Sequence, residues 1–175
     1  MTDRLAVVVL GTRDAGKTTT WKTLFGRPVK TGEKPRKLWF GDSEWVEVFL
    51  VSGSHQERGM RIEQVVREPL PRILLCSVQY KGDAQEAFTF LQKNRYSLFV
   101  TRLNPGYGEP GPLPDSLGLG SSLVEQGATF QARSGKADPV VRTQEMLEFI
   151  YGWARGHGLV MNDEGVLPKI APQVR

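Results

Sequence analysis

The sequence predicts an α/β domain with a mostly parallel six-stranded sheet, helices on both faces and one antiparallel edge hairpin. Strand-like and helix-like segments alternate along the chain, and this alternation is typical of a parallel sheet. Residues 5–10 are continuously apolar and rich in β-branched side chains, as expected for a strand buried on both faces. The 175 residues, 39% hydrophobic and 24% charged, suit a single core. We place the domain at residues 1–157 and a C-terminal tail at 158–175.

Each further element follows from its local pattern. A helix at 17–25 has apolar residues at helical spacing and ends at Gly26 and Pro28. Strands at 37–40 and 45–51 flank a polar, glycine-containing turn, which predicts a hairpin. The other expected elements are a short helix at 60–66, strands at 72–78, 96–101 and 128–132, and helices at 83–91, 115–126 and 140–155.

Two helix starts and one turn can be specified more closely. Asp83 with Glu86 three residues later forms a capping-box pattern. Asp138 precedes Pro139, and proline is favoured in the first turn of a helix. In the tail, turn chemistry occurs at residues 162–165, so the tail is expected to pack on the surface or to be mobile.

Residues 11–18 read Gly-Thr-Arg-Asp-Ala-Gly-Lys-Thr and fit the pattern G-x-x-x-x-G-K-[ST] at every defined position. Glycines let successive backbone N–H groups approach a phosphate, and the helix that follows presents its positive end. Lys17 can reach the terminal phosphates, and Thr18 can hold Mg²⁺ through its hydroxyl. A glycine turn that only joins strand to helix would not explain Lys17 and Thr18 together. The motif therefore predicts a P-loop NTPase fold that binds a nucleoside triphosphate.

The stretch at residues 7–19 resembles the opening of Ras-like small GTPases, and residues 14–19 are most similar to the Arf-like branch. The order of elements resembles that fold over about residues 3–157, with the hairpin at the place of the family's second and third strands. The resemblance implies a set of nucleotide-binding residues: Gly11, Arg13, Asp14, Ala15, Gly16, Lys17, Thr18, Thr19 and Asn104.

The loop at 52–58 resembles the family's second switch, where Asp-x-x-Gly is often followed by Gln-Glu. Gln56 and Glu57 match the end of that pattern, while Ser52 stands at the Asp position and His55 at the Gly position. The resemblance implies that Gln56 orients the attacking water, with Lys17 as the other catalytic residue. An ordinary solvated loop residue is the alternative interpretation of Gln56.

The resemblance also implies a metal site and a base site. Thr31 would be the first-switch threonine that closes on Mg²⁺ beside Thr18; an ordinary loop threonine is the alternative. Asn104 lies where the guanine-reading Asn-Lys-x-Asp motif begins, but Pro105 and Tyr107 replace its Lys and Asp. GTP and GDP are therefore the expected nucleotides, with ATP possible. Arg13 would either crowd the catalytic water or offer its charge to the γ-phosphate.

Three functions remain open: a GTP-binding switch with slow Mg²⁺-dependent hydrolysis, a nucleotide-binding pseudo-GTPase that acts as a protein-interaction module, and a small ATPase or kinase. A protein effector or regulator is expected as a partner. The net charge of +4 is spread along the chain without a Lys/Arg block, which argues against nucleic acid as a partner. One cysteine, Cys76, fits a reducing, cytoplasmic setting. Thr2 at the myristoylation position and the absence of a terminal Cys predict no membrane anchor.

Overall fold

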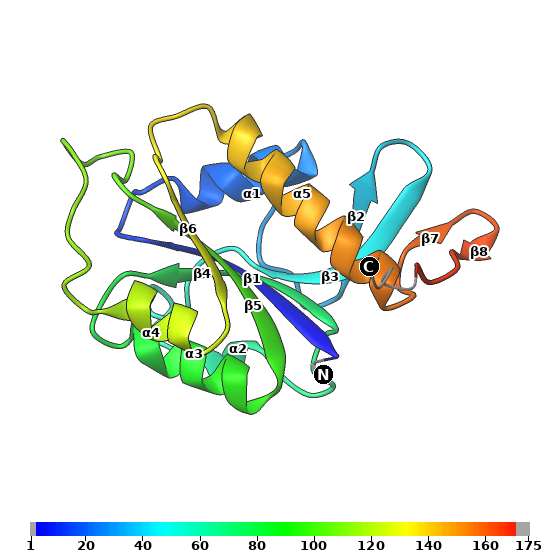
Figure 1. Ribbon diagram of the computed structural model, residues 1–175, viewed down its shortest axis with the longest axis horizontal. Helices are drawn as coiled ribbons and strands as arrows, with labels where there is room; N and C mark the ends of the chain where they lie inside the picture. Colours follow the sequence, from blue (N-terminus) through cyan, green and yellow to red (C-terminus); the bar gives the residue numbers. More distant parts are fainter. Residues whose placement is uncertain (1–2, 171–175) are drawn as a thin grey trace.

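The structure is a computed structural model that describes residues 3–170, so Thr2 and the last five residues lie outside the described part (Figure 1). It is an α/β domain in which helices cover both faces of one mixed sheet. In chain order the elements are β1 (Arg4–Gly11), α1 (Lys17–Phe25), β2 (Arg36–Phe40), β3 (Glu44–Val51), α2 (Ile62–Val65), β4 (Ile73–Gln79), α3 (Ala84–Lys93), β5 (Tyr96–Leu103), α4 (Leu119–Glu125), β6 (Thr129–Arg133), α5 (Pro139–Gly156), β7 (Met161–Asn162) and β8 (Gly165–Val166).

The sheet has the strand order β6-β5-β1-β4-β3-β7-β8, with β2 also paired to β3. The strands β3, β4, β1, β5 and β6 are parallel, while β2, β7 and β8 pair in antiparallel fashion. The described residues form eight strands, not the expected six, and two hairpins, not the expected one. Residues 161–166 of the tail form a second hairpin, and Met161 pairs with Trp45 of β3. The turn of this hairpin is visible in the sequence, but its partner strand lies more than a hundred residues away.

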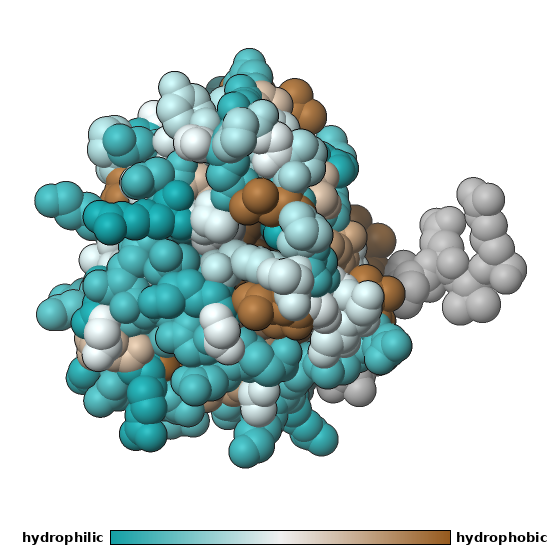
Figure 2. Space-filling view, turned by 90° about the vertical axis from the view of Figure 1, so that its left-hand side faces the viewer, coloured by the Kyte–Doolittle hydropathy of each residue, from teal (hydrophilic) through white to brown (hydrophobic). Residues whose placement is uncertain are grey.

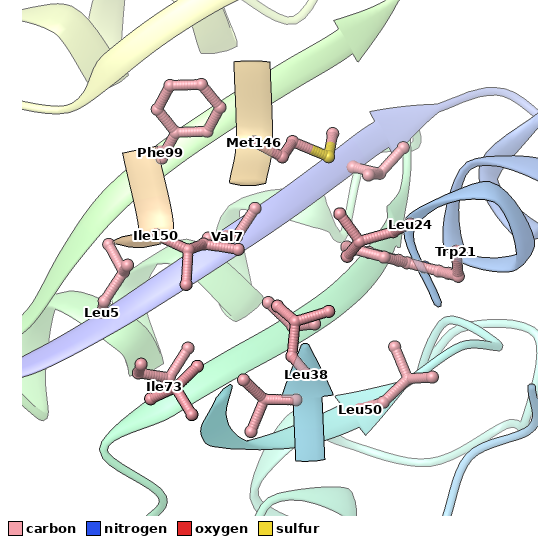
Figure 3. Close-up of a cluster of buried hydrophobic side chains, with 14 of the residues drawn as sticks. Leu5, Val7, Trp21, Leu24, Leu38, Leu50, Ile73, Phe99, Met146 and Ile150 are labelled. Carbon is pink, nitrogen blue, oxygen red and sulfur yellow. The ribbon is translucent and has the colours of Figure 1, made fainter. Parts of the chain in front are cut away.

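The strand β1 runs through the middle of the sheet and contributes to both cores. Its residues Leu5, Val7 and Val9 pack with α1 and α5, and the alternate residues pack with α3 and α4. Figure 3 shows the first of these cores, where side chains of β1, α1 and α5 meet. Trp21 is fully buried there, and its indole N–H donates to the hydroxyl of Ser77 at 2.8 Å. Each large apolar side chain buried in this way contributes about 1.5–3 kcal/mol of transfer free energy.

Both predicted helix starts are confirmed, but the capping box predicted at Asp83 is wrong. Asp138 caps α5, because its carboxylate accepts from the backbone N–H of Val140 at 3.0 Å. Asp83 precedes α3 but its side chain caps no backbone N–H, since the carboxylate accepts a hydrogen bond from Gln56 instead. A tertiary contact has therefore replaced the local capping box.

The carboxyl ends of β1, β3, β4, β5 and β6 lie at one edge of the sheet, on the left in Figure 1. The chain reaches β1's two neighbours, β4 and β5, consecutively, so α3 crosses from one side of β1 to the other. In α/β sheets, ligands bind at such a switch point, outside the carboxyl ends of the strands. Among residues 3–170, no helix is both long and apolar enough to cross a membrane.

Candidate functional site

A cleft of about 1020 Å³ lies at this edge of the sheet, above the end of β1. Figure 2 looks onto this edge and shows a mainly hydrophilic surface. Five loops form its walls, namely those after β1, β3, β4, β5 and β6. The lining residues are Arg13, Asp14, Ala15, Gly16, Lys17, Thr18, Thr19, Ser52, Gln56, Glu57, Gln79, Lys81, Tyr107, Gly135, Lys136, Ala137, Asp138, Pro139 and Arg142. Most of the predicted nucleotide-binding residues are therefore brought together in one place.

The two glycines of the motif are required by the geometry of the turn. A Cβ on Gly11 would lie 2.8 Å from the Cβ of Ala15, which is too close for a side chain. Gly16 has φ 109° and lies directly before α1, in the left-handed region that favours glycine. Asp14 also has a positive φ of 57°. These turns bring the backbone of residues 11–16 around the front of α1.

Lys17 is folded back over this turn. Its ammonium donates to the backbone carbonyls of Gly11 at 3.1 Å and Thr12 at 2.7 Å, and the residue is only 6% exposed. Burial lowers the pKa of Lys17, while the charges of Glu57 and Asp14 act in the opposite direction. No carboxylate within residues 3–170 accepts a hydrogen bond from this ammonium. A cation desolvated without an ion pair is costly, so a bound anion would relieve that cost.

The start of α1 is open to a ligand. No side chain caps its N-terminus, and its first turn contains no acidic residue. Thr18 and Thr19 are exposed on this turn and line the cleft. The positive end of the helix and the free hydroxyls are therefore available to an anion and its metal.

The loops after β5 and β6 contact the turn after β1. The N–H of Tyr107 donates to the carbonyl of Ala15 at 3.1 Å, and the N–H of Gly135 donates to Pro105 at 2.7 Å. A Cβ on Gly135 would lie 2.2 Å from the carbonyl oxygen of Ala15. Only glycine fits there, a constraint that the sequence alone did not indicate because the neighbour is distant along the chain.

Glu109 also links the loop after β5 to the turn after β1. Its carboxylate accepts from the hydroxyl of Thr12 and from the N–H of Gly106, the latter at 2.8 Å. Since both oxygens are engaged, Glu109 braces the turn rather than facing a ligand.

Arg142 of α5 is a site residue that sequence reasoning missed. It lines the cleft although it is only 2% exposed, and burial lowers the pKa of its guanidinium, opposed by the charge of Asp138. Its Nε donates to the hydroxyl of Thr20 at 2.9 Å, and Nη1 donates to the carbonyl of Ala137 at 3.3 Å. Arg142 thereby joins α1 to the loop after β6. The only sequence signal is a charged residue on the apolar face of a helix.

The predicted Gln56 lines the cleft, but its amide is committed elsewhere. Its Nε2 donates to the carbonyl of Gln79 at 2.8 Å and to Asp83 at 3.0 Å, while its Oε1 accepts from the N–H of Gln79 at 2.9 Å. Both ends of the amide are thus held by the end of β4 and the start of α3. In this conformation both N–H groups of the amide are used, and one lone pair of Oε1 is left for a water molecule.

Three predicted residues lie outside the lining of the cleft, namely Gly11, Thr31 and Asn104. The hydroxyl of Thr31 accepts from the N–H of Ser52 at 2.8 Å, which holds the loop before β2 against the end of β3. The amide of Asn104 pairs with the backbone of Leu113, donating at 2.9 Å and accepting at 2.9 Å. A base-reading role for Asn104 would have to use the second N–H and the second lone pair of this amide.

The oxygen donors in the cleft fit Mg²⁺ and not a metal held by protein alone. The hydroxyls of Thr18 and Ser52 and the carboxylate of Glu57 line the same cleft. Among residues 3–170, no group of three or more His, Cys, Asp or Glu side chains could hold a metal ion. Mg²⁺ suits this donor set, because it usually binds one or two protein ligands and takes the rest from phosphates and water.

Comparison with known proteins found no matching family model, no similar curated protein and no similar solved structure. The case for function therefore depends on the geometry of the cleft.

Proposed function

We propose that this chain binds a nucleoside triphosphate, with the phosphates on the turn at residues 11–18 and the positive end of α1. The observation that carries the proposal is the buried ammonium of Lys17. It is held on the backbone of Gly11 and Thr12, at the start of an uncapped helix, and no carboxylate of residues 3–170 is bonded to it. A polyanion would supply the missing negative charge.

In this proposal each residue of the turn has a physical role. The backbone N–H groups of residues 13, 14, 16 and 17 would face the phosphates, whereas that of Ala15 donates to the carbonyl of Thr12 at 3.2 Å. Lys17 would turn from the carbonyls of Gly11 and Thr12 to the terminal phosphates. Thr18 would hold Mg²⁺, which when bound neutralises the charge between the β- and γ-phosphates. Arg13 and Lys136 add positive charge to the rim of the cleft.

We further propose that the chain is a small GTPase-like switch with slow hydrolysis, working in the cytoplasm with a protein effector or regulator. The motif and the resemblance to Ras-like proteins support this proposal. A second candidate, a nucleotide-binding module without hydrolysis, is favoured by one observation: the amide of Gln56 is bonded to Gln79 and Asp83.

Titration of the chain with fluorescent GTP, GDP and ATP analogues, with and without Mg²⁺, tests the proposal. Saturable binding of at least one triphosphate is expected, strengthened by Mg²⁺. Absence of binding to all three nucleotides at millimolar concentration would overturn the proposal. Release of phosphate under single-turnover conditions then separates the switch from the non-hydrolysing module.

A further inference from the structure

The wall of the cleft beside β3 lacks the carboxylate that the resemblance would place there. Ser52 follows β3 directly and is 8% exposed, and it brings only a hydroxyl to the cleft. A P-loop site of this type normally holds its Mg²⁺ with a threonine or serine of the turn and an acidic residue of a neighbouring strand. Another acidic residue near the end of β3 would have to supply this carboxylate.

Three carboxylates line the cleft, namely Asp14, Glu57 and Asp138. Asp138 is engaged, because its carboxylate caps the first turn of α5 at Val140. Asp14 lies on the phosphate-binding turn itself, not on the wall beside β3. Glu57 belongs to the loop that begins at Ser52, and it is therefore the carboxylate of the wall beside β3.

The loop after β3 is built so that the side chain of Glu57 stays on the cleft. The N–H of Glu57 donates to the hydroxyl of Ser54 at 3.2 Å, and the N–H of Met60 donates to the carbonyl of His55 at 3.0 Å, which closes the turn. The amide of the preceding Gln56 is clamped to the backbone of Gln79. With its neighbour held on β4, Glu57 is left exposed toward the cleft.

We propose that Glu57 supplies the protein carboxylate for the Mg²⁺ of the bound nucleotide, in place of an acidic residue at Ser52. This inference depends on the proposed nucleotide binding. With Thr18 on one side and Glu57 on the other, the ion would have one hydroxyl and one carboxylate from the protein, and phosphate and water would complete its shell.

The test is the effect of Mg²⁺ on nucleotide affinity, measured for whichever of GTP and ATP binds more tightly. The variants are Glu57→Gln, Asp14→Asn and, as a matched control, Glu63→Gln, an exposed glutamate of α2 that does not line the cleft. Dissociation constants are measured with excess Mg²⁺ and with a chelator, and circular dichroism checks that each variant is folded. Mn²⁺ bound to each protein–nucleotide complex is followed by electron paramagnetic resonance.

In Glu57→Gln, the factor by which Mg²⁺ strengthens nucleotide binding is expected to be at least about tenfold smaller than in the parent. The variant should also bind Mn²⁺ more weakly, while its nucleotide affinity in chelator stays close to that of the parent. Glu63→Gln and Asp14→Asn should keep the full Mg²⁺ effect. An unchanged Mg²⁺ effect in Glu57→Gln, or its loss in Asp14→Asn, would overturn the inference. So would a parent that binds nucleotide without any Mg²⁺ effect, although nucleotide binding would then stand. A parent that binds no nucleotide in either condition would refute the proposed function itself.

Discussion

The side-chain amide of Gln56 is bonded at both ends to the backbone of Gln79, accepting from its N–H at 2.9 Å and donating to its carbonyl at 2.8 Å. This arrangement continues the pairing of β3 and β4 beyond their last backbone hydrogen bonds. Gln56 therefore fastens the loop after β3 to β4, and this structural role competes with the catalytic role that the resemblance implied.

We expect slow hydrolysis for this reason, at or below the order of ~10⁻⁴ s⁻¹ that applies to an unassisted small GTPase. Gln56→Ala should change the rate by less than about tenfold, because the amide is held by Gln79 and Asp83, and should lower the free energy of unfolding by about 1–2 kcal/mol. Single-turnover phosphate release and urea unfolding measure the two effects. Gln144→Ala, at an exposed position of α5, is the matched control for unfolding.

A loss of hydrolysis by more than about a hundredfold in Gln56→Ala, with unchanged stability, would restore Gln56 as the catalytic glutamine. A parent rate far above the unassisted value, with no partner present, would contradict the expectation of a slow site.

Gly135→Ala should destabilise the protein and weaken nucleotide binding together. Its Cβ would lie 2.2 Å from the carbonyl oxygen of Ala15, so the turn at residues 11–18 must shift. Overpacking of this kind costs about 1–3 kcal/mol. Gly152→Ala is the control, because a Cβ there meets nothing and alanine favours the interior of α5 by roughly 0.5–1 kcal/mol. Thermal unfolding and nucleotide titration check both variants, and a fully stable, fully binding Gly135→Ala would show that the contact has no importance.

Lys17→Met should stabilise the nucleotide-free protein at neutral pH while removing nucleotide binding. Burial lowers the pKa of Lys17 from 10.5, so the unfolded chain binds the proton more tightly than the folded one. The charge therefore opposes folding below the lowered pKa, and the parent's stability rises with pH between that pKa and 10.5. Removing the charge should raise the free energy of unfolding by about 0.5–2 kcal/mol at pH 7.

The difference in the free energy of unfolding between Lys17→Met and the parent should shrink as the pH approaches 10.5, since the parent loses the opposing charge there. Urea unfolding from pH 7 to pH 10 measures this slope. A Lys17→Met protein that is less stable than the parent throughout would show that the bonds to Gly11 and Thr12 outweigh the desolvation of the ammonium.

The α/β elements and the turn at residues 11–18 were largely predictable because their signals are local. The expected helix at 17–25 coincides with α1, and the hairpin strands agree with β2 and β3 to within a residue. Residues 13–18 of the motif also line one cleft. Periodicity, glycine positions and the spacing of Lys17 and Thr18 are all read within about ten residues.

The parts that could not be predicted depend on distant contacts. Asp83 has the sequence of a helix cap, but Gln56 is close in space and takes its carboxylate. Met161 lies in a tail that was expected to pack on the surface or to be mobile, and it pairs with Trp45 at the edge of β3. Arg142 enters the cleft from a helix that the motif does not include.

Base discrimination should be poor, because the carboxylates and amides that could read a base are already engaged. Asn104 is paired with Leu113, and Glu109 is bonded to Thr12 and Gly106. Asp115 accepts from the N–H groups of Leu119 and Gly120 and from the hydroxyl of Tyr80.

A site rejects the wrong base strongly only when a buried polar group would otherwise be left unpaired. We therefore expect GTP and ATP to differ by less than about 2 kcal/mol, or roughly thirtyfold. Competition of unlabelled GTP and ATP against one labelled nucleotide measures the difference. A preference of about a thousandfold would mean that one of these engaged groups is released when nucleotide binds.

The dissociation constant of a nucleoside triphosphate for Lys17→Ala, compared with Lys22→Ala, tests the central claim most directly. Both lysines lie on α1, but only Lys17 lines the cleft, whereas Lys22 is exposed in the last turn. Calorimetric titration in Mg²⁺ should show affinity at least about a hundredfold weaker for Lys17→Ala, or ~2.8 kcal/mol, and little changed for Lys22→Ala. A folded Lys17→Ala protein that binds the triphosphate as tightly as the parent would contradict the account.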